Sequence, residues 1–371
     1  MSSDFGHNGS MHVRRLACMA GLVALSGCAT TPRTMAALQR PGHISPPCRF
    51  EVAPTSGPPD APLGWTVPDR QRDLDALDGW CRATGPAVVD ATPVLAPAGS
   101  RDLTLVSWNL HAGEADLEAF VGRLRAGTYT GGQPVTRFVL LLQEAHRGGP
   151  DVPLPGAGPT PGRTIRKRHR SADVAGLAAR HGLALIYVPS MRNGPARVVY
   201  EDRGNAILST EPLSDLEAIE LPFERQRRVA VAATIHAPGA DGRPVPLRIA
   251  SVHLDVAASF RRLWFLGARK AQVRGLLAVL GQHDSLVVGG DFNTWFGFSD
   301  GAYQAMAAAV PDISGVDRRP TFGPLRLDHV FSRLPEGWNV RARRLDERLG
   351  SDHYPILVQF STGERRMIAD Q

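Results

Sequence analysis

The chain has 371 residues, of which 43% are hydrophobic and 21% charged, and these proportions exclude wholesale disorder. This length allows one large hydrophobic core or two of ordinary size. The formal net charge of +6 suits an anionic partner such as a nucleic acid, a lipid headgroup or a phosphorylated metabolite, although a solvated arginine-rich surface gives the same balance.

The amino terminus has the order of a secretory signal. Arg14 and Arg15 precede an apolar run of residues 16–25, which is too short to span a bilayer and leads into the sequence Leu-Ser-Gly-Cys28. This sequence resembles the bacterial lipobox, in which the cysteine is lipidated and becomes the first residue of the mature protein. We therefore expect residues 1–28 to be a signal peptide and Cys28 to carry the lipid. The protein would then be a membrane-anchored lipoprotein of the periplasm or outer membrane, with secretion as the alternative.

The four cysteines, Cys18, Cys28, Cys48 and Cys81, show no CxxC spacing, so a zinc ribbon or a thiol redox motif is not supported. Export would place Cys48 and Cys81 in an oxidising compartment, where they could pair. Sequence leaves that pairing open.

Composition divides the rest of the chain into three parts. Residues 29–100 are rich in Pro, Ala, Gly and Thr, which predicts a tether with one small ordered piece between Leu74 and Trp80. Residues 101–362 alternate short apolar runs with amphipathic stretches and predict a folded domain. Residues 363–371 form a C-terminal tail.

Within the folded domain, local patterns predict the following elements in chain order. The expected strands are Leu103–Trp108, Phe138–Leu142, Ala184–Val188, Asn205–Ser209, Arg228–Ile235, Leu247–Val252, Leu286–Gly289, Leu327–Phe331 and Ile356–Phe360. The expected helices are Glu114–Arg125, Ala172–His181, Ser259–Leu280 and Asp300–Ala309, with Ser171 and Ser299 as N-caps. Many strands with few helices between them indicate packed sheets covered by helices, not a doubly wound nucleotide-binding fold.

Polar side chains stand where these strands end. They are Asn109, Gln143-Glu144, His253, Asp291 with Asn293, Asp328-His329 and Asp352-His353. Charged groups against a core are costly unless they are paired or bind a metal. Carboxylate and amide oxygens are ligands that Mg²⁺ prefers, and histidine can supply proton transfer. The pattern therefore predicts phosphoester hydrolysis at a magnesium site, and zinc is disfavoured because carboxylates and amides outnumber His and Cys.

The order of these motifs over residues 102–361 resembles the deoxyribonuclease-I-like endonuclease/exonuclease/phosphatase family. The motifs are Asn109, Gln143-Glu144, Arg203-Gly204-Asn205, Ser251-Val252-His253, Gly290-Asp291-Phe292-Asn293, Leu327-Asp328-His329 and Ser351-Asp352-His353-Tyr354-Pro355. A lone Gly-Asp-Phe-Asn would be a weak signal, whereas seven motifs in order at strand ends are a strong one. The resemblance implies an α/β fold, namely a four-layer α/β sandwich in which two mixed β-sheets pack face to face and are flanked by helices.

The resemblance also implies a metal-dependent phosphoric ester hydrolase. Mg²⁺ is the expected cofactor, with Mn²⁺ and Ca²⁺ as alternatives. Glu144 would be the principal ligand, Asn109 would contact the metal or the phosphate, and Asp352 would lie beside the metal.

Catalytic roles follow from the same resemblance. Asp291 would orient or deprotonate the attacking water, and Asn293 would help to hold the phosphate. His353, positioned by Asp328, would contact the scissile phosphate. His253 would polarise a phosphate oxygen or assist the leaving group, although a satisfied core histidine is the simpler alternative.

Two assignments stay open at this point. Arg228, together with Asn205, is expected to contact the substrate phosphate, but Arg227 is an equal candidate. The acidic partner that supports His253 in some relatives is not identified, and Asp255 and Glu201 are weak candidates for it.

The substrate depends on loops. The Gly/Pro-rich and basic segment 147–170, which contains the basic run 163–170, and residues 295–298 are the expected determinants of selectivity. They would contact phosphates, bases or lipid, and the alternatives are a solvated loop and packing beneath the next helix. The first hypothesis is an extracytoplasmic nuclease or general phosphodiesterase. The others are a sphingomyelinase-like or inositol-phosphate phosphoesterase acting at a membrane, and a non-catalytic anion-binding lipoprotein. We expect a monomer.

Overall fold

The computed structural model describes residues 63–68, 70–94, 102–153, 173–193, 200–239, 241–256 and 266–362, together with strand residues 38–39 and 52–53. All of them belong to one structural unit, residues 35–371. The expected signal peptide with Cys28, the basic segment 163–170 and the tail 363–371 lie outside the described residues. No helix within the described part of the chain is both long and apolar enough to cross a membrane.

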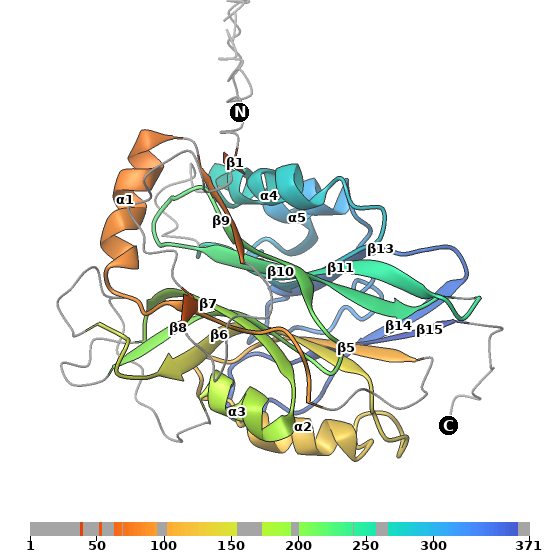
Figure 1. Cartoon of the computed structure of the whole chain (residues 1–371). Helices are drawn as coiled ribbons and strands as arrows, with labels where there is room; N and C mark the ends of the chain where they lie inside the picture. Colours follow the sequence, from red (N-terminus) through yellow and green to blue (C-terminus); the bar gives the residue numbers. More distant parts are fainter. Residues whose placement is uncertain are drawn as a thin grey trace, which may run out of the picture. The chain divides into compact units, whose positions relative to one another are not determined.

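Two mixed β-sheets form the centre of this unit (Figure 1). The seven-stranded sheet has the spatial order β1 (Leu38–Gln39), β3 (Gly64–Pro68), β9 (Ser214–Glu220), β10 (Val229–Pro238), β11 (Pro244–His253), β12 (Leu286–Asp291) and β13 (Asp328–Arg333). The eight-stranded sheet has the order β14 (Trp338–Arg344), β15 (Ile356–Thr362), β5 (Leu103–Asn109), β6 (Phe138–Gly148), β8 (Glu201–Ser209), β7 (Ala184–Arg192), β4 (Ala87–Asp90) and β2 (Val52–Ala53). Parallel pairs such as β5 with β6 and β11 with β12 stand among antiparallel ones.

Helices cover the outer faces of both sheets. They are α2 (Leu117–Arg125), α3 (Val174–His181), α4 (Leu266–Leu280) and α5 (Gly301–Ala307), with a 3-10 turn η2 (Gly297–Ser299) before α5. Helix α1 (Gln71–Cys81) instead contacts β3 of one sheet and β7 of the other. Helices α2 and α3 lie on the eight-stranded sheet, and α4 and α5 lie on the seven-stranded sheet (Figure 1). The predicted four-layer α/β sandwich is therefore confirmed.

The main hydrophobic core lies between the sheets, where alternate residues of their strands face one another. Leu105 and Val139 from one sheet join Val231, Ile249 and Val287 from the other in a single buried cluster. Because each such side chain contributes about 1.5–3 kcal/mol when it is fully buried, this layer fixes how the two sheets are stacked. The stacking in turn brings the strand ends of both sheets to one edge.

Helix boundaries follow capping chemistry that the sequence prediction missed. The side chains of Asp173 and Asp300 cap α3 and α5, in place of the expected Ser171 and Ser299. Asp173 accepts hydrogen bonds from two backbone amides of the first turn, so it satisfies two donors that the helix leaves open. Helix α3 ends at Gly182, whose φ of 62° suits glycine.

Within the predicted folded domain, strands β9 and β14 escaped prediction because neither has a continuous apolar run. Strand β14 at the edge of its sheet is basic and mostly half-buried, and β9 is interrupted by Asp215, Glu217 and Glu220. Near the amino terminus, α1 includes the short ordered piece that the sequence indicated, and β3 and β4 on either side of it extend the two sheets. Residues 64–90 thus belong to the sandwich.

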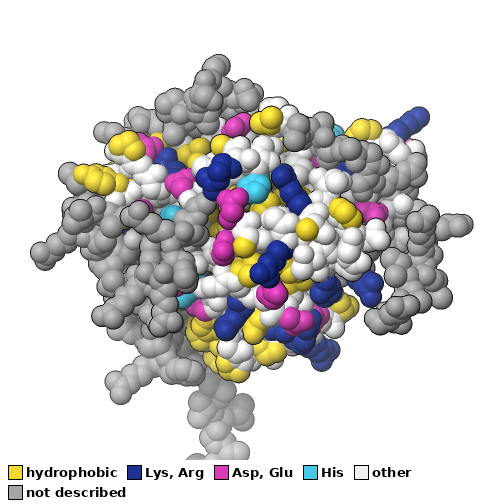
Figure 2. All heavy atoms as spheres, turned by 90° about the horizontal axis from the view of Figure 1, so that it is seen from below, with side chains coloured by type: hydrophobic (Ala, Val, Ile, Leu, Met, Phe, Trp, Pro, Cys, Tyr) yellow, Lys and Arg dark blue, Asp and Glu magenta, His cyan; other side chains and the backbone are white. Residues whose placement is uncertain are grey.

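The face formed by α2 and α3 carries charges of both signs. Figure 2 shows basic, acidic and histidine side chains interspersed on it, without a continuous field of one sign. Among them, Glu118 contacts Arg180 at 2.8 Å and His181 at 2.6 Å. Such exposed pairs contribute little to stability, and we interpret this face as an ordinary solvent-exposed surface.

Candidate active site

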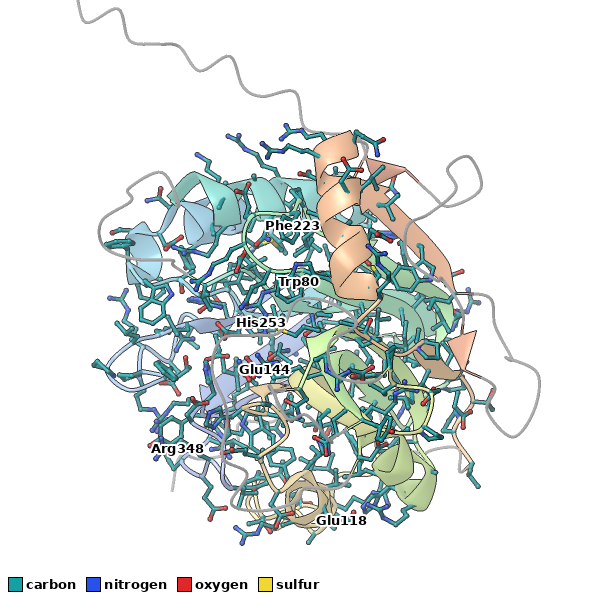
Figure 3. All side chains as sticks on the ribbon, turned by 90° about the vertical axis from the view of Figure 1, so that its left-hand side faces the viewer. Trp80, Glu118, Glu144, Phe223, His253 and Arg348 are labelled. Carbon is teal, nitrogen blue, oxygen red and sulfur yellow. The ribbon has the colours of Figure 1, made fainter. Side chains whose placement is uncertain are left out.

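The strand ends bring the polar residues together at one edge of the sandwich. The ends of the parallel strands β11 and β12 pair His253 with Asp291, and the antiparallel β13 places Asp328 opposite Asp291. In the other sheet, Asn109 ends β5 beside Gln143 of β6. Figure 3 shows Glu144 and His253 near one another between the two sheets, so residues remote in sequence share one site.

Asp291 lies at the centre of this site. Its Oδ2 accepts a hydrogen bond of 3.0 Å from Asn109 Nδ2 and lies 3.4 Å from His253 Nε2 and 3.8 Å from His353 Nε2. Its Oδ1 accepts a hydrogen bond from the backbone nitrogen of Asn293. Burial raises the pKa of Asp291 to about 7; His353 opposes this rise, and the nearby Asp328 adds to it.

His353 and Asp328 form a buried pair. His353 Nδ1 lies 2.8 Å from Asp328 Oδ2, and the ring of Phe322 packs against the imidazole at 4.8 Å between centroids. Burial lowers the pKa of His353, but the negative charge of Asp328, with smaller contributions from Asp291 and Asp352, raises it to about 10. His353 is therefore an imidazolium at neutral pH.

His253 has the opposite charge state. Burial lowers its pKa well below the ordinary value, and the positive charges of Arg228 and His353 lower it further. The two histidines thus flank Asp291 as one neutral ring and one cation. Asp291 is the acid beside His253. Of the sequence candidates, the Asp255 carboxylate holds the backbone amides of residues 225 and 226, and the Glu201 carboxylate accepts a hydrogen bond from Asn193 Nδ2.

A β-bulge sets the direction of Glu144. The pairing of β6 with β8 shifts register between Leu142 and Ala145, so two residues of β6 face one of β8. Glu144 has a φ of 52°, a left-handed conformation that is uncommon for a residue other than glycine. Bulges of this kind redirect a side chain, and here the redirected carboxylate stands at the site.

Positive groups surround the Glu144 carboxylate. Its Oε2 accepts hydrogen bonds from the backbone nitrogen of Ala112 at 2.8 Å and from Arg203 Nη1 at 3.2 Å. Burial raises the pKa of Glu144, but Arg203, Arg228 and His353 lower it overall below the ordinary value. The carboxylate is therefore charged.

The oxygen donors at this edge fit a hard divalent cation. No hydrogen bond from a described residue engages Glu144 Oε1, and the Asp352 carboxylate, 37% exposed, lies 3.5 Å from His111 Nε2. Among the described residues, Asn109 Oδ1 accepts a hydrogen bond only from the backbone nitrogen of His111. A carboxylate pair and an amide oxygen are the ligand types that Mg²⁺ prefers.

A tighter group of ligand-type atoms, from Asp291, Asp328 and His353, lies within 4.8 Å, but its chemistry disfavours a metal. His353 already bonds Asp328 and is protonated, and a protonated imidazole has no lone pair to offer a cation. Within this group, Asp328 and His353 form an acid–imidazole pair.

The structure separates the two candidate arginines. Arg227 binds Glu220 through Nε and Nη2 and donates to the backbone oxygen of Pro189 at 2.9 Å, so its guanidinium is committed to the fold. Arg228 donates to Gln226 Oε1 at 3.2 Å, and its buried Nε has no hydrogen-bond partner among the residues that the structure describes. Its pKa is lowered by burial and raised in part by Asp255, Glu144 and Asp291, so Arg228 is the cation near the site.

Arg227→Met should test this division through stability. The change would leave Glu220 as a buried, unpaired charge, and we expect the free energy of unfolding to fall by about 3–5 kcal/mol. Urea denaturation measures the loss, and replacing Glu220 by Met in the same chain should recover much of it. A single variant as stable as the wild type would contradict the buried pairing.

Asn205 and Asn293 are held by backbone groups. Asn205 Nδ2 donates to the carbonyl oxygens of Val229 at 2.7 Å and Ser251 at 3.3 Å, which ties the two sheets together. A contact of that amide nitrogen with phosphate would require the loss of one of these bonds, and it stays a prediction. Asn293, with a φ of 49°, donates through Nδ2 to the carbonyl oxygen of Leu254 at 3.0 Å.

Several neighbours of the site were not assigned roles from sequence. His111 lies between Asp352 and Glu114, 3.5 Å from each. Arg203 bonds Glu144, although its motif had been noted without a role for the arginine. The position of His111 two residues after a strand-end asparagine is a signal that could have found it. Side chains at such a turn are ordinarily solvated, so the position of His111 alone does not predict a functional role.

The aromatic loop after Asn293 is partly exposed. The side chain of Phe296 is 52% exposed and that of Phe298 is 38% exposed, which does not fit packing beneath α5 for Phe296. Phe298 packs edge-on against Tyr303 of α5, with centroids 5.0 Å apart. Phe298 therefore fits the expected packing against the next helix, whereas the exposure of Phe296 fits the expected contact with substrate.

Fold and site together define a hydrolase of the class that acts on phosphoester bonds. The chain belongs to the endonuclease/exonuclease/phosphatase family, whose model matches residues 106–353, as the motif order had suggested. No curated protein matches the chain significantly.

Solved structures with a similar course of the chain share little sequence with it. An endonuclease/exonuclease/phosphatase from Beutenbergia cavernae is 21% identical, with a TM-score of 0.47 over 71% of this chain and 72% of its own. The human Nocturnin catalytic domain is 19% identical, with a TM-score of 0.49 over 75% and 98%. Sphingomyelinase C from Streptomyces griseocarneus is 17% identical, with a TM-score of 0.42 over 70% and 99%.

Proposed function

We propose that this protein is a divalent-metal-dependent phosphodiesterase that acts outside the cytoplasm, with nucleic acid as its first candidate substrate. The observation that carries the proposal is the position of Asp291 Oδ2 among Asn109, neutral His253 and cationic His353. An acid, a base and a positive charge thus lie within 3.8 Å of one carboxylate oxygen. A net charge of +6 suits a polyanionic substrate.

In this proposal Asp291 accepts the proton of the attacking water, since its raised pKa makes the carboxylate a base suited to neutral pH. Asn109 orients the carboxylate through its amide. His353, as an imidazolium fixed by Asp328, and Arg228 stabilise the negative charge that develops on the phosphoryl oxygens. His253 and Asn293 complete the contacts to the phosphate and the leaving group.

A divalent cation would be held by Glu144, Asn109 and Asp352. Mg²⁺ is the proposed ion, with Mn²⁺ and Ca²⁺ as alternatives, and it would supply Lewis-acid polarisation of a phosphoryl oxygen. The chain itself holds the Glu144 carboxylate in place. The backbone nitrogen of Ala112 and the guanidinium of Arg203 donate hydrogen bonds to it, and Arg203 keeps it charged.

A side-by-side assay tests the function. Bis-(p-nitrophenyl) phosphate, plasmid DNA and sphingomyelin are offered in turn with Mg²⁺, with EDTA and with the His353→Ala variant. We expect Mg²⁺-dependent cleavage of the first two substrates. Cleavage of sphingomyelin alone would support the membrane-lipid alternative, and no cleavage of any substrate would support the non-catalytic alternative.

Glu144→Ala is expected to lower kcat at limiting Mg²⁺ by about 100-fold, because the principal carboxylate ligand would be lost. Excess Mg²⁺ should restore part of the activity, since the remaining oxygens still offer a weak site. Titration of activity with Mg²⁺, together with direct calorimetry of the cation, measures this shift. An unchanged affinity for the cation would refute the metal assignment.

Export and lipidation are proposed on the signal at residues 1–28. Cys81 is disulfide-bonded, which suits an oxidising compartment, and the other three cysteines lie outside the described residues. Cys28→Ser is expected to release the protein from membrane fractions into the soluble fraction, because the lipid attachment point would be lost. Membrane partitioning identical to that of the wild type would contradict lipidation.

A further inference from the structure

The loop between β9 and β10, residues 221–228, delivers Arg228 to the site. Its ends are joined by the hydrogen bond from Leu221 N to the Arg228 carbonyl oxygen at 2.9 Å. Between these ends the chain leaves the ladder of the sheet, so other parts of the molecule must fix the course of the loop.

One group of anchors comes from the seven-stranded sheet side. Asp255 Oδ2 accepts hydrogen bonds from the backbone nitrogens of Arg225 at 2.9 Å and Gln226 at 3.1 Å. Gln272 of α4 donates to the carbonyl oxygen of Pro222 at 3.1 Å. Because Gln226 Oε1 accepts a hydrogen bond from the guanidinium of Arg228, the placement of residue 226 helps to set the direction of that arginine.

A second group of anchors comes from α1, which precedes the family-matched residues 106–353. Phe223 packs against Leu77 and Cys81 of α1, and its ring lies 6.4 Å from that of Trp80. Figure 3 shows the labelled pair Trp80 and Phe223 on the same side of the molecule as Glu144 and His253. Thr84, just after the helix, accepts a hydrogen bond of 3.4 Å from Arg227.

We propose that α1 braces the 221–228 loop through Phe223 and thereby positions Arg228 for the phosphate of the substrate. The proposal deepens the proposed function and rests on it. Phe223 and Trp80 are positioning residues, because they hold the loop and leave contact with substrate to Arg228. The amino-terminal segment is in this way part of the site.

The physical reason is that residues 225–227 are held by hydrogen bonds, whereas the tip of the loop at Phe223 is held against α1 by apolar packing. Without the Phe223 ring, the tip keeps the Asp255 bonds but loses its only apolar contact with α1 among those described. A guanidinium that samples several directions stabilises the phosphate less well, and a misplacement of about 1 Å is enough to lower a rate strongly. Phe223→Leu should keep the apolar contact and therefore the placement of the loop.

Phosphate binding and hydrolysis by four variants test the brace. We compare Phe223→Ala, Phe223→Leu, Arg228→Met and the double variant Phe223→Ala/Arg228→Met in the full chain with Mg²⁺. The readouts are the Kd of inorganic phosphate by calorimetry, kcat and KM for bis-(p-nitrophenyl) phosphate, and the unfolding temperature. Trp80→Leu repeats the comparison from the α1 side if Phe223→Ala does not fold.

We expect Phe223→Ala to weaken phosphate binding by about tenfold and Phe223→Leu to bind nearly as the wild type does. In the Arg228→Met background the same Phe223→Ala change should have no further effect, since the group that it positions is absent. Unchanged phosphate binding in Phe223→Ala, or an equal loss in both backgrounds, would overturn the brace. A wild type that binds phosphate but hydrolyses nothing would refute the proposed function and leave the binding comparison as the test of the brace.

Discussion

Asp291→Asn is expected to lower kcat/KM for phosphodiester hydrolysis by about 1,000-fold, a typical size for the loss of a general base. An asparagine oxygen can still accept the hydrogen bond of Asn109, so the arrangement of the strand ends should persist. The amide cannot take up a proton, and its NH₂ group would stand at the Oδ1 position, where it would face the backbone nitrogen of Asn293. Steady-state kinetics at saturating Mg²⁺ measures the loss.

A control variant separates the loss of a catalytic group from the general effect of removing a carboxylate. Asp346→Asn removes a carboxylate that is 70% exposed and far less constrained, and it should keep full activity. A loss of less than about tenfold in Asp291→Asn would contradict its role as the base.

The difference in stability between Asp291→Asn and the wild type should depend on pH in a defined direction. Burial raises the folded-state pKa of Asp291 from 3.8 to about 7, so its contribution to stability is full below the lower value and is lost as pH rises through the upper one. Without a metal, and at mildly alkaline pH, Asp291→Asn should therefore unfold at a temperature no lower than that of the wild type. The difference should shrink as pH falls toward 3.8.

His353→Ala is expected to lower kcat/KM by about 100- to 1,000-fold, because the imidazolium beside the phosphate would be lost. His236 lies on an exposed part of β10, and His236→Ala is the matched control that should leave activity unchanged. Activity of His353→Ala within about threefold of the wild type would rule out a role for this ring in the reaction.

The partner of His353 predicts a shift in pH dependence. The pKa of His353 is raised to about 10, so its protonated form persists until pH rises through that value. Asp328→Asn removes the first of the groups that raise it, and the alkaline limb of kcat/KM should move to lower pH. An alkaline limb in the same place in Asp328→Asn would show that another group titrates there.

The two histidines of the site differ in charge state. Burial, with the positive charges of Arg228 and His353, lowers the pKa of His253, whereas Asp328 outweighs burial and raises the pKa of His353. Neither state is evident from the residues that flank each histidine in the chain, because both burial and the neighbouring charges come from the stacking of the two sheets.

Much of the fold and of the candidate site could be predicted from sequence because the signals are local. Apolar runs marked the strands from Leu103 onward, and polar residues directly after those runs marked the strand ends that meet at one edge. Strand β14 escaped because its arginines leave no apolar run, and Asp173 and Asp300 replaced the expected serine caps because either residue type can accept the amides of a first turn.

By itself, the sequence of this protein determined the family and the order of its acid, amide and imidazole groups, since each stands next to its own strand in the chain. Tertiary structure decided the partners. Asn109 bonds Asp291 across 182 positions of sequence, Glu144 turns at a bulge, and Arg228 lies at the site while Arg227 pairs with Glu220. Hydrogen bonds and pKa values depend on distances in space, and only the stacking of the two sheets and the bracing of their loops set those distances.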